Sequence, residues 1–135
     1  MNYLALELIK EHEGLSLTTY TDSVGIPTIG YGHNLTRPIS EEAANQILKD
    51  DIQTAVLDAA KFGWYEDLND VRKAVIIDMV YNLGLTRFKK FQRMDKAIRE
   101  EDYELAAYEM LDSKWARQVG SRAEDLAAIF SRGEI

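Results

Sequence analysis

The sequence predicts an α+β fold that is mainly helical, with a small N-terminal β-hairpin subdomain and a C-terminal helical lobe. Alternating apolar and polar residues occur near the start, from Leu15 to Tyr20, and the period changes to the helical 3.6 residues after Pro38. The segment 70–83 is apolar around nearly its whole circumference, which is typical of a buried central helix. A separate hairpin region followed by helices indicates a small α+β subdomain packed against an all-helical body.

The chain length predicts one domain. A chain of 135 residues buries roughly two-thirds of its unfolded surface, and 46% apolar residues are typical of a globular protein. We expect a single domain over residues 1–135. Within it, a small lobe spans about 14–61, and a helical lobe spans about 62–135 together with the helix of residues 1–13.

Composition excludes several classes of protein. The absence of cysteine excludes a disulfide framework and a thiolate zinc site. The net charge of −7 argues against nucleic acid as the main partner. The first residues lack the basic start of a signal peptide, and Glu7 interrupts their apolar run. No stretch reaches the length of a membrane span, so we expect no stable membrane association.

A run of basic residues interrupts the acidic composition. It consists of Arg87, Lys89, Lys90, Arg93, Lys96 and Arg99. Two interpretations remain open: a solvated helix face, which is the commoner case, and a surface that meets an anionic polymer.

The N-terminal elements follow from local signals. Ala5, Leu8, Ile9 and His12 form one stripe of a helix over 3–13, and Gly14 supplies its left-handed stop, which places Glu13 in the last turn. Residues 15–20 then alternate like a half-buried strand. The sequence Asp22-Ser-Val-Gly25 has the chemistry of a turn, and Pro27 fits only a strand start or edge. Residues 28–32 should return antiparallel.

The helical elements follow in order after Pro38. Ser40 is a suitable N-cap for a helix that runs to about Lys61, and residues 62–65 are predicted as a loop. Asn69 caps the central helix over 70–83, in which Asp78 and Asn82 are polar exceptions. We expect their side chains to be satisfied by hydrogen bonds, although Asn82 could instead line a cleft. Gly84 ends this helix. Shorter helices are predicted over 91–99, 102–111, 114–119 and 121–131.

Two carboxylates, Glu13 and Asp22, lie before and after the first predicted strand. Hydrolysis of a glycosidic bond needs one protonated and one ionised carboxyl group. Glu13 ends a helix, where the negative end of the macrodipole disfavours an ionised carboxylate, and burial beside Leu15 and Leu17 would add to this. Asp22 lies in a turn whose backbone amides can stabilise its ionised form. Taken alone, this spacing is more often structural, and Thr28 is then simply a β-branched strand residue.

Read as a whole, the stretch from Glu13 to His33 resembles the signature of the phage-type lysozymes, the muramidase family of the T-even phages. The matching residues are Glu13-Gly-Leu15, Tyr20, Asp22, Gly25, Thr28-Ile-Gly30 and Gly32-His33. Similar stretches follow in the same order as Asp51–Val56, Val71–Ala74, Asn82–Gly84, Ser113–Trp115, Arg122-Ala123 and Phe130–Gly133. The resemblance covers most of the chain and implies a lysozyme-like fold.

The resemblance also implies a role for each matching position. Glu13 would be the general acid, whereas Asp22 and Thr28 would hold and activate water on the opposite face of the sugar, so that the reaction inverts. His33 and Asp51 would form a structural pair rather than a metal site. Arg122 would approach Glu13 and favour its ionised form, which opposes the effect of the helix end.

Substrate-binding positions match the family less closely. Asn34, Tyr81, Met94 and Glu109 fall where family members contact the glycan, and only Tyr81 keeps a comparable side chain, an aromatic ring that could pack on a sugar. The chain also lacks a stretch after His33 that T-even members carry, so we expect a more compact small lobe.

The function that the resemblance implies is that of an endolysin, a muramidase acting on bacterial peptidoglycan between N-acetylmuramic acid and N-acetylglucosamine. It would need no metal or organic cofactor and would act as a monomer. It would remain in the host cytoplasm until a separate membrane-permeabilising protein released it to the wall. Two alternatives are a lytic transglycosylase, which needs one carboxyl group and no activated water, and a non-catalytic cell-wall-binding phage component.

Overall fold

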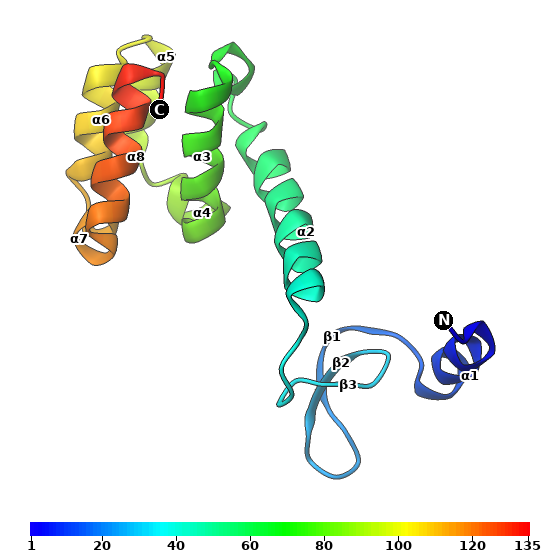
Figure 1. Cartoon of the computed structure of the whole chain (residues 1–135). Helices are drawn as coiled ribbons and strands as arrows, with labels where there is room; N and C mark the ends of the chain where they lie inside the picture. Colours follow the sequence, from blue (N-terminus) through cyan, green and yellow to red (C-terminus); the bar gives the residue numbers. More distant parts are fainter. The chain divides into compact units, whose positions relative to one another are not determined.

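A computed structural model describes all residues 1–135 and confirms the mainly helical α+β class (Figure 1). The chain forms two compact units, Met1–Ala44 (unit 1) and Asn45–Ile135 (unit 2), and each is described by itself. None of the helices combines the length and the apolar character needed to cross a membrane. The division into lobes at about residue 61 remains a prediction.

Unit 1 begins with helix α1 (Tyr3–Glu13), whose ends are those that the sequence predicts. The Asn2 side-chain oxygen caps the helix by accepting a hydrogen bond from the Ala5 amide at 3.0 Å. Gly14 ends the helix with φ +68°, and its amide donates to the Lys10 carbonyl at 3.0 Å. Because glycine adopts positive φ without steric cost, the chain turns sharply there and leaves Glu13 as the last helical residue.

One antiparallel sheet follows α1. Its strands, in spatial as well as chain order, are β1 (Ser16–Thr21), β2 (Pro27–Gly30) and β3 (His33–Asn34). The sequence predicted β1, the start of β2 at Pro27 and their antiparallel pairing, but not β3. In the central strand, Thr28 lies opposite Tyr20 on one side and Asn34 on the other. A neighbour on each side leaves the Thr28 side chain only 3% exposed.

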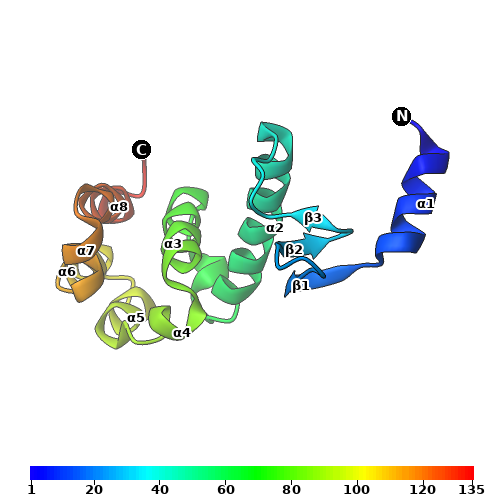
Figure 2. The same cartoon turned by 90° about the horizontal axis from the view of Figure 1, so that it is seen from below.

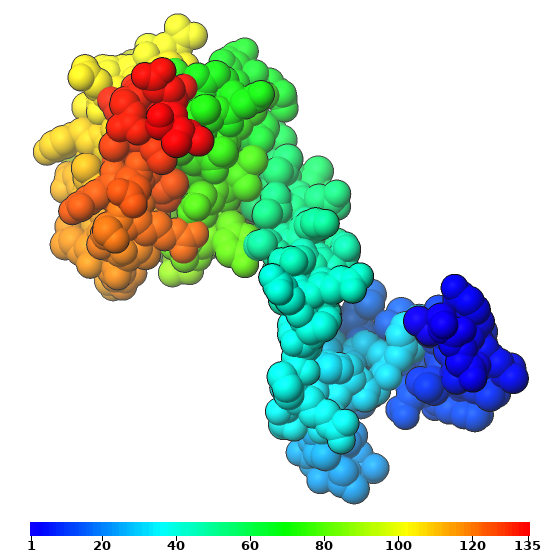
Figure 3. All heavy atoms as spheres, in the orientation of Figure 1, coloured from blue at the N-terminus to red at the C-terminus, as the bar shows by residue number.

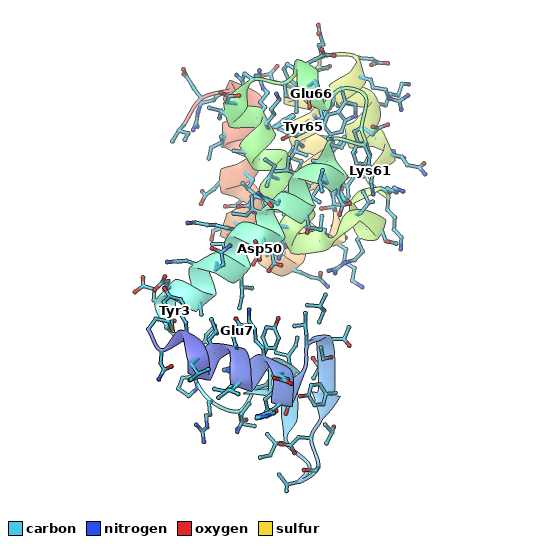
Figure 4. The ribbon with its side chains drawn as sticks, turned by 90° about the vertical axis from the view of Figure 1, so that its right-hand side faces the viewer. Tyr3, Glu7, Asp50, Lys61, Tyr65 and Glu66 are labelled. Atoms are coloured by element: carbon cyan, nitrogen blue, oxygen red, sulfur yellow. The ribbon has the colours of Figure 1, made fainter.

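The helices that follow, shown in two views in Figures 1 and 2, are α2 (Glu41–Ala59), α3 (Asp70–Leu83), α4 (Leu85–Phe88), α5 (Gln92–Arg99), α6 (Tyr103–Leu111), α7 (Lys114–Val119) and α8 (Ser121–Arg132). All but α4 were predicted. Residues 62–64 form a loop as predicted, and a 3-10 helix follows at Tyr65–Asp67, where Tyr65 is buried (Figure 4). The Lys73 ammonium lies 5.4 Å from the Tyr65 ring centre and 3.5 Å from the Glu66 carboxylate, which fixes this turn against α3.

The core of unit 2 lies between α3 and the helices that follow it. Helix α6 contacts α5 and α8, and α8 also contacts α3 and α7, so the green-to-red part of Figure 3 is closely packed. The largest fully buried side chains are Ile76, Met79, Phe88, Met94, Ile98, Met110 and Phe130. Two of them, Ile76 and Met79, belong to α3. The predicted N-cap of this helix is also observed, because Asn69 Oδ1 accepts a hydrogen bond from the Arg72 backbone amide at 2.8 Å. The prediction of a capped, central core helix is confirmed.

Candidate functional site

Unit 1 contains all three residues predicted to be catalytic. Glu13 is the last residue of α1, Asp22 directly follows β1, and Thr28 lies in the middle of β2. The turn between β1 and β2 and the sharp turn at Gly14 therefore decide where these side chains lie.

Asp22 is held by the turn that it begins. Its Oδ1 atom accepts hydrogen bonds from the backbone amides of Val24 and Ile26, each at 2.9 Å. Its own carbonyl accepts from the Gly25 amide at 3.1 Å, where φ is +87° and glycine is favoured. The expected turn with amides directed at the carboxylate is confirmed. Oδ2 accepts no hydrogen bond from the protein and is free for a ligand.

The backbone of Ile26 connects Asp22 with Thr28. The Ile26 carbonyl accepts both the Asp22 amide at 2.9 Å and the Thr28 hydroxyl at 2.8 Å. Because the hydroxyl proton of Thr28 is used in that bond, the Thr28 oxygen can act toward a further partner only as an acceptor. A water molecule there would donate one proton to Thr28, which is how a hydroxyl group orients a nucleophile.

Within unit 1, Glu13 makes no hydrogen bond or ion pair, and its side chain is exposed. Leu15 and Leu17 are 55% and 81% exposed, so neither side chain is packed within unit 1, and burial of the carboxyl group beside them remains a prediction. Both side chains belong to a short segment with no covering layer in unit 1. The close neighbour of the Glu13 carboxyl is instead Gly32, in the turn between β2 and β3.

Strand β3 carries Asn34, a predicted substrate-binding residue, and His33, a predicted supporting residue. Asn34 uses its side-chain oxygen locally, accepting from the amide and the hydroxyl of Thr36 at 2.8 and 2.6 Å, which leaves its NH₂ group available to a ligand. His33 is exposed and lies opposite Ile29 in the sheet. Asp51 is an exposed residue of α2 in unit 2. The predicted pair of His33 and Asp51 remains a prediction.

The polar residues of α3 have partners within unit 2. Arg122 donates two hydrogen bonds to Asp78 Oδ1, at 3.0 Å from Nε and 2.7 Å from Nη2. The indole N–H of Trp115 donates to Asn82 Oδ1 at 2.7 Å. The expectation that these polar groups are satisfied by hydrogen bonds is confirmed. The sequence singled out both Arg122 and Asp78 but did not predict that they pair, because their separation of 44 positions leaves no local signal.

Unit 2 also contains a cavity of about 650 Å³, which is within the usual size of a ligand site. Glu109 and Met94 line it, as do Phe91 and Trp115, whose rings meet edge to face. Its charged lining residues are Arg87, Lys90, Arg93, Lys114, Glu109 and Asp112. None of the six takes part in an ion pair within unit 2. Tyr81 does not line the cavity but is 45% exposed on α3.

A mainly helical α+β chain with one carboxylate at a helix end and another in the following hairpin turn has the features of a lysozyme-like protein. The family model described as phage lysozyme matches residues 10–132, and the chain belongs to this family. Family membership assigns it to the lysozyme-like cell-wall hydrolases.

Three relatives illustrate the range of the similarity. "Probable T4-type lysozyme 2" of Dictyostelium discoideum is 26% identical over 160 positions, which cover 96% of this chain and 94% of the relative. "Endolysin" of Bacillus phage B103 is 30% identical over 96% of this chain and 53% of its own length. "Pre-baseplate central spike protein Gp5" of Enterobacteria phage T4 is 26% identical over 99% of this chain and 28% of its own length. Since 160 aligned positions exceed 135 residues, the first relative contains residues that this chain lacks.

Proposed function

We propose that the chain is an endolysin-type muramidase that hydrolyses the β-1,4 bond between N-acetylmuramic acid and N-acetylglucosamine in bacterial peptidoglycan. The observation that carries this proposal is the arrangement around Ile26. The backbone amide of Ile26 donates a hydrogen bond to Asp22 Oδ1, and the carbonyl of Ile26 accepts one from the Thr28 hydroxyl. Two groups able to hold one water molecule are thereby fixed on one hairpin, while Glu13 ends the neighbouring helix.

In the proposed reaction, Glu13 gives a proton to the leaving glycosidic oxygen. Asp22 and Thr28 hold a water molecule by its two protons, one directed to the free Oδ2 of Asp22 and one to the Thr28 oxygen. As the water attacks the anomeric carbon from the opposite face, its proton passes to Asp22, and the configuration inverts. Both proton transfers use side chains, so the reaction needs no cofactor.

The proposed setting is the infected bacterial host. We propose that the enzyme acts as a monomer on peptidoglycan, waits in the host cytoplasm, and is released to the wall by a separate membrane-permeabilising protein. The relative named "Endolysin" supports this setting. We further propose that His33 with Asp51 and Arg122 with Glu13 make the supporting contacts that the family resemblance implies.

Analysis of the products tests this function against its rivals. Purified peptidoglycan is digested and the new chain ends are identified by mass spectrometry. A muramidase leaves muramic acid with a free reducing end. An anhydro-muramic acid end instead indicates a lytic transglycosylase. Binding to the wall without any new chain ends indicates a non-catalytic cell-wall-binding phage component.

Replacing Thr28 by valine tests the role of the hydroxyl group. Thr28→Val keeps the branched shape in a buried strand position, and the Ile26 carbonyl keeps its bond from the Asp22 amide. We expect a loss of about 1 kcal/mol in the free energy of unfolding, as for one hydrogen bond. We expect kcat for peptidoglycan to fall about 10²-fold, the low end for groups that assist proton transfer. Thr28→Ser keeps the hydroxyl and should retain most activity, and equal kcat values for the two variants would contradict the role.

Tyr81, Asn34 and Glu109 are proposed to contact the glycan. Tyr81 is 45% exposed and makes no hydrogen bond with the protein, so Tyr81→Ala should leave the melting temperature nearly unchanged. If its ring packs on a sugar equally in ground and transition states, KM rises several-fold while kcat stays constant. Tyr108→Ala, which removes an exposed tyrosine from α6, is the control. An unchanged KM in Tyr81→Ala would remove Tyr81 from the binding surface.

A further inference from the structure

Gly32 lies in the turn between β2 and β3 and faces the Glu13 carboxyl group. A Cβ atom built on Gly32 would lie 2.6 Å from Oε2 of Glu13, 2.8 Å from its Cδ and 3.2 Å from its Cγ. Real Cβ atoms do not approach other heavy atoms so closely, so the carboxyl group occupies the space that any side chain at position 32 would fill. We propose that Gly32 is a positioning residue for the acid: its missing side chain defines where the Glu13 carboxyl lies. This inference rests on the proposed function of Glu13.

A second contact connects the same turn with the same face of α1. The Lys10 ammonium lies 5.5 Å from the centre of the Tyr31 ring. Lys10 precedes Glu13 by three residues and therefore lies on the same face of the helix. In the turn, Tyr31 directly precedes Gly32. Two successive residues of the turn thus meet two residues one helical turn apart. The cation and ring stabilise the approach, and the glycine allows the carboxyl group to fit.

The contact constrains a side chain that has no other close partner in unit 1. Glu13 makes no hydrogen bond or ion pair, so its several rotamers are not selected by polar interactions. The atoms that a Cβ at position 32 would meet are the far end of a flexible side chain and not backbone atoms. An alanine there is consequently expected to displace the carboxyl group while the fold is kept.

Gly30 provides a matched control two residues earlier. Its φ of +71° is nearly the same as the +72° of Gly32, so alanine meets the same backbone strain at either position. A Cβ on Gly30, however, would have nothing within 4 Å. The difference between Gly32→Ala and Gly30→Ala isolates the contact with Glu13 from the conformational cost of removing a glycine.

The experiment measures Tm, kcat and KM on purified peptidoglycan for both variants. We expect the two substitutions to lower Tm by similar amounts. We expect kcat to fall about 10²-fold in Gly32→Ala, because a displacement of about 1 Å of a catalytic group costs that much, with KM little changed. Gly30→Ala should keep kcat within a few-fold of the parent enzyme.

Shortening the acid gives an independent measurement. In Glu13→Asp the carboxyl carbon takes the place of Cγ and a carboxyl oxygen that of Cδ, so no atom reaches the place of Oε2, the atom closest to the missing Cβ. Adding Gly32→Ala to Glu13→Asp should therefore reduce kcat by a smaller factor than adding it to the parent enzyme. Two residues in contact are expected to show such non-additivity, whereas a general weakening of the fold acts equally in both backgrounds.

Three results would overturn the inference: equal kcat in Gly32→Ala and Gly30→Ala, additive effects with Glu13→Asp, and loss of the fold in Gly32→Ala. Loss of the fold in Gly32→Ala would contradict the inference, because the inference requires that the carboxyl group moves while the backbone stays in place. The test is separate from that of the proposed function. If Glu13→Gln remains active, the acid role itself fails, whereas an inactive Glu13→Gln with indistinguishable glycine variants removes only the role of Gly32.

Discussion

Glu13→Gln is expected to reduce peptidoglycan lysis about 10⁴-fold, to the background of the assay. An amide has nearly the size of the carboxylic acid but cannot donate a proton to the leaving oxygen, and positioned general acids contribute up to about that factor. Since Glu13 makes no hydrogen bond or ion pair within unit 1, the substitution removes no stabilising interaction from that unit. Circular dichroism and Tm should therefore match those of the parent enzyme.

The control for this variant is Glu7→Gln. Glu7 is an exposed glutamate six residues earlier on α1, labelled in Figure 4. Its substitution makes the same change of charge on the same helix and should leave lysis unchanged. Lysis by Glu13→Gln at near the parent rate would remove Glu13 from the reaction, and an equal loss in both variants would point to net charge.

Asp22→Asn is expected to reduce kcat by about 10²- to 10⁴-fold while the turn is kept. Asparagine can place its side-chain oxygen where Asp22 Oδ1 lies and accept the same two amides, of Val24 and Ile26. What it loses is the negative charge and the basicity of the free oxygen, which the proposed reaction uses to take a proton from water. The measurement is kcat on purified peptidoglycan together with Tm.

Asp22→Ala separates the turn from the chemistry. Alanine offers no acceptor to the two amides, so its free energy of unfolding should fall by about 1–3 kcal/mol in addition to the loss of kcat. If Asp22→Asn loses only a few-fold in kcat while Asp22→Ala loses stability, Asp22 is a turn residue and not the base.

Features carried by short stretches of sequence could be predicted. The extent of α1 follows from its apolar stripe and from Gly14, and the turn at Asp22 follows from residues whose own side chains and backbone make its hydrogen bonds. Helix α3 was identified as central because its apolar residues leave no polar face, and Ile76 and Met79 are fully buried. In each case the signal and the contact lie within a few positions of each other.

Features that depend on distant residues were not predicted. Asp78 meets Arg122 across 44 positions, and Gly32 meets Glu13 through a turn whose third strand was not expected. Leu15 and Leu17 alternate like half-buried strand residues but are mostly exposed, since alternation does not say whether a covering layer exists. The helix α4 is only four residues long, too short for any periodic signal.

The most direct test of the central claim is the anomeric configuration of the newly formed reducing end. Purified peptidoglycan fragments are digested inside an NMR spectrometer, and the first anomer is recorded before mutarotation. If Asp22 and Thr28 direct water to the face opposite Glu13, cleavage of the β-1,4 bond gives the α-anomer first. Initial formation of the β-anomer would indicate a retaining reaction and would contradict the proposed roles of Asp22 and Thr28.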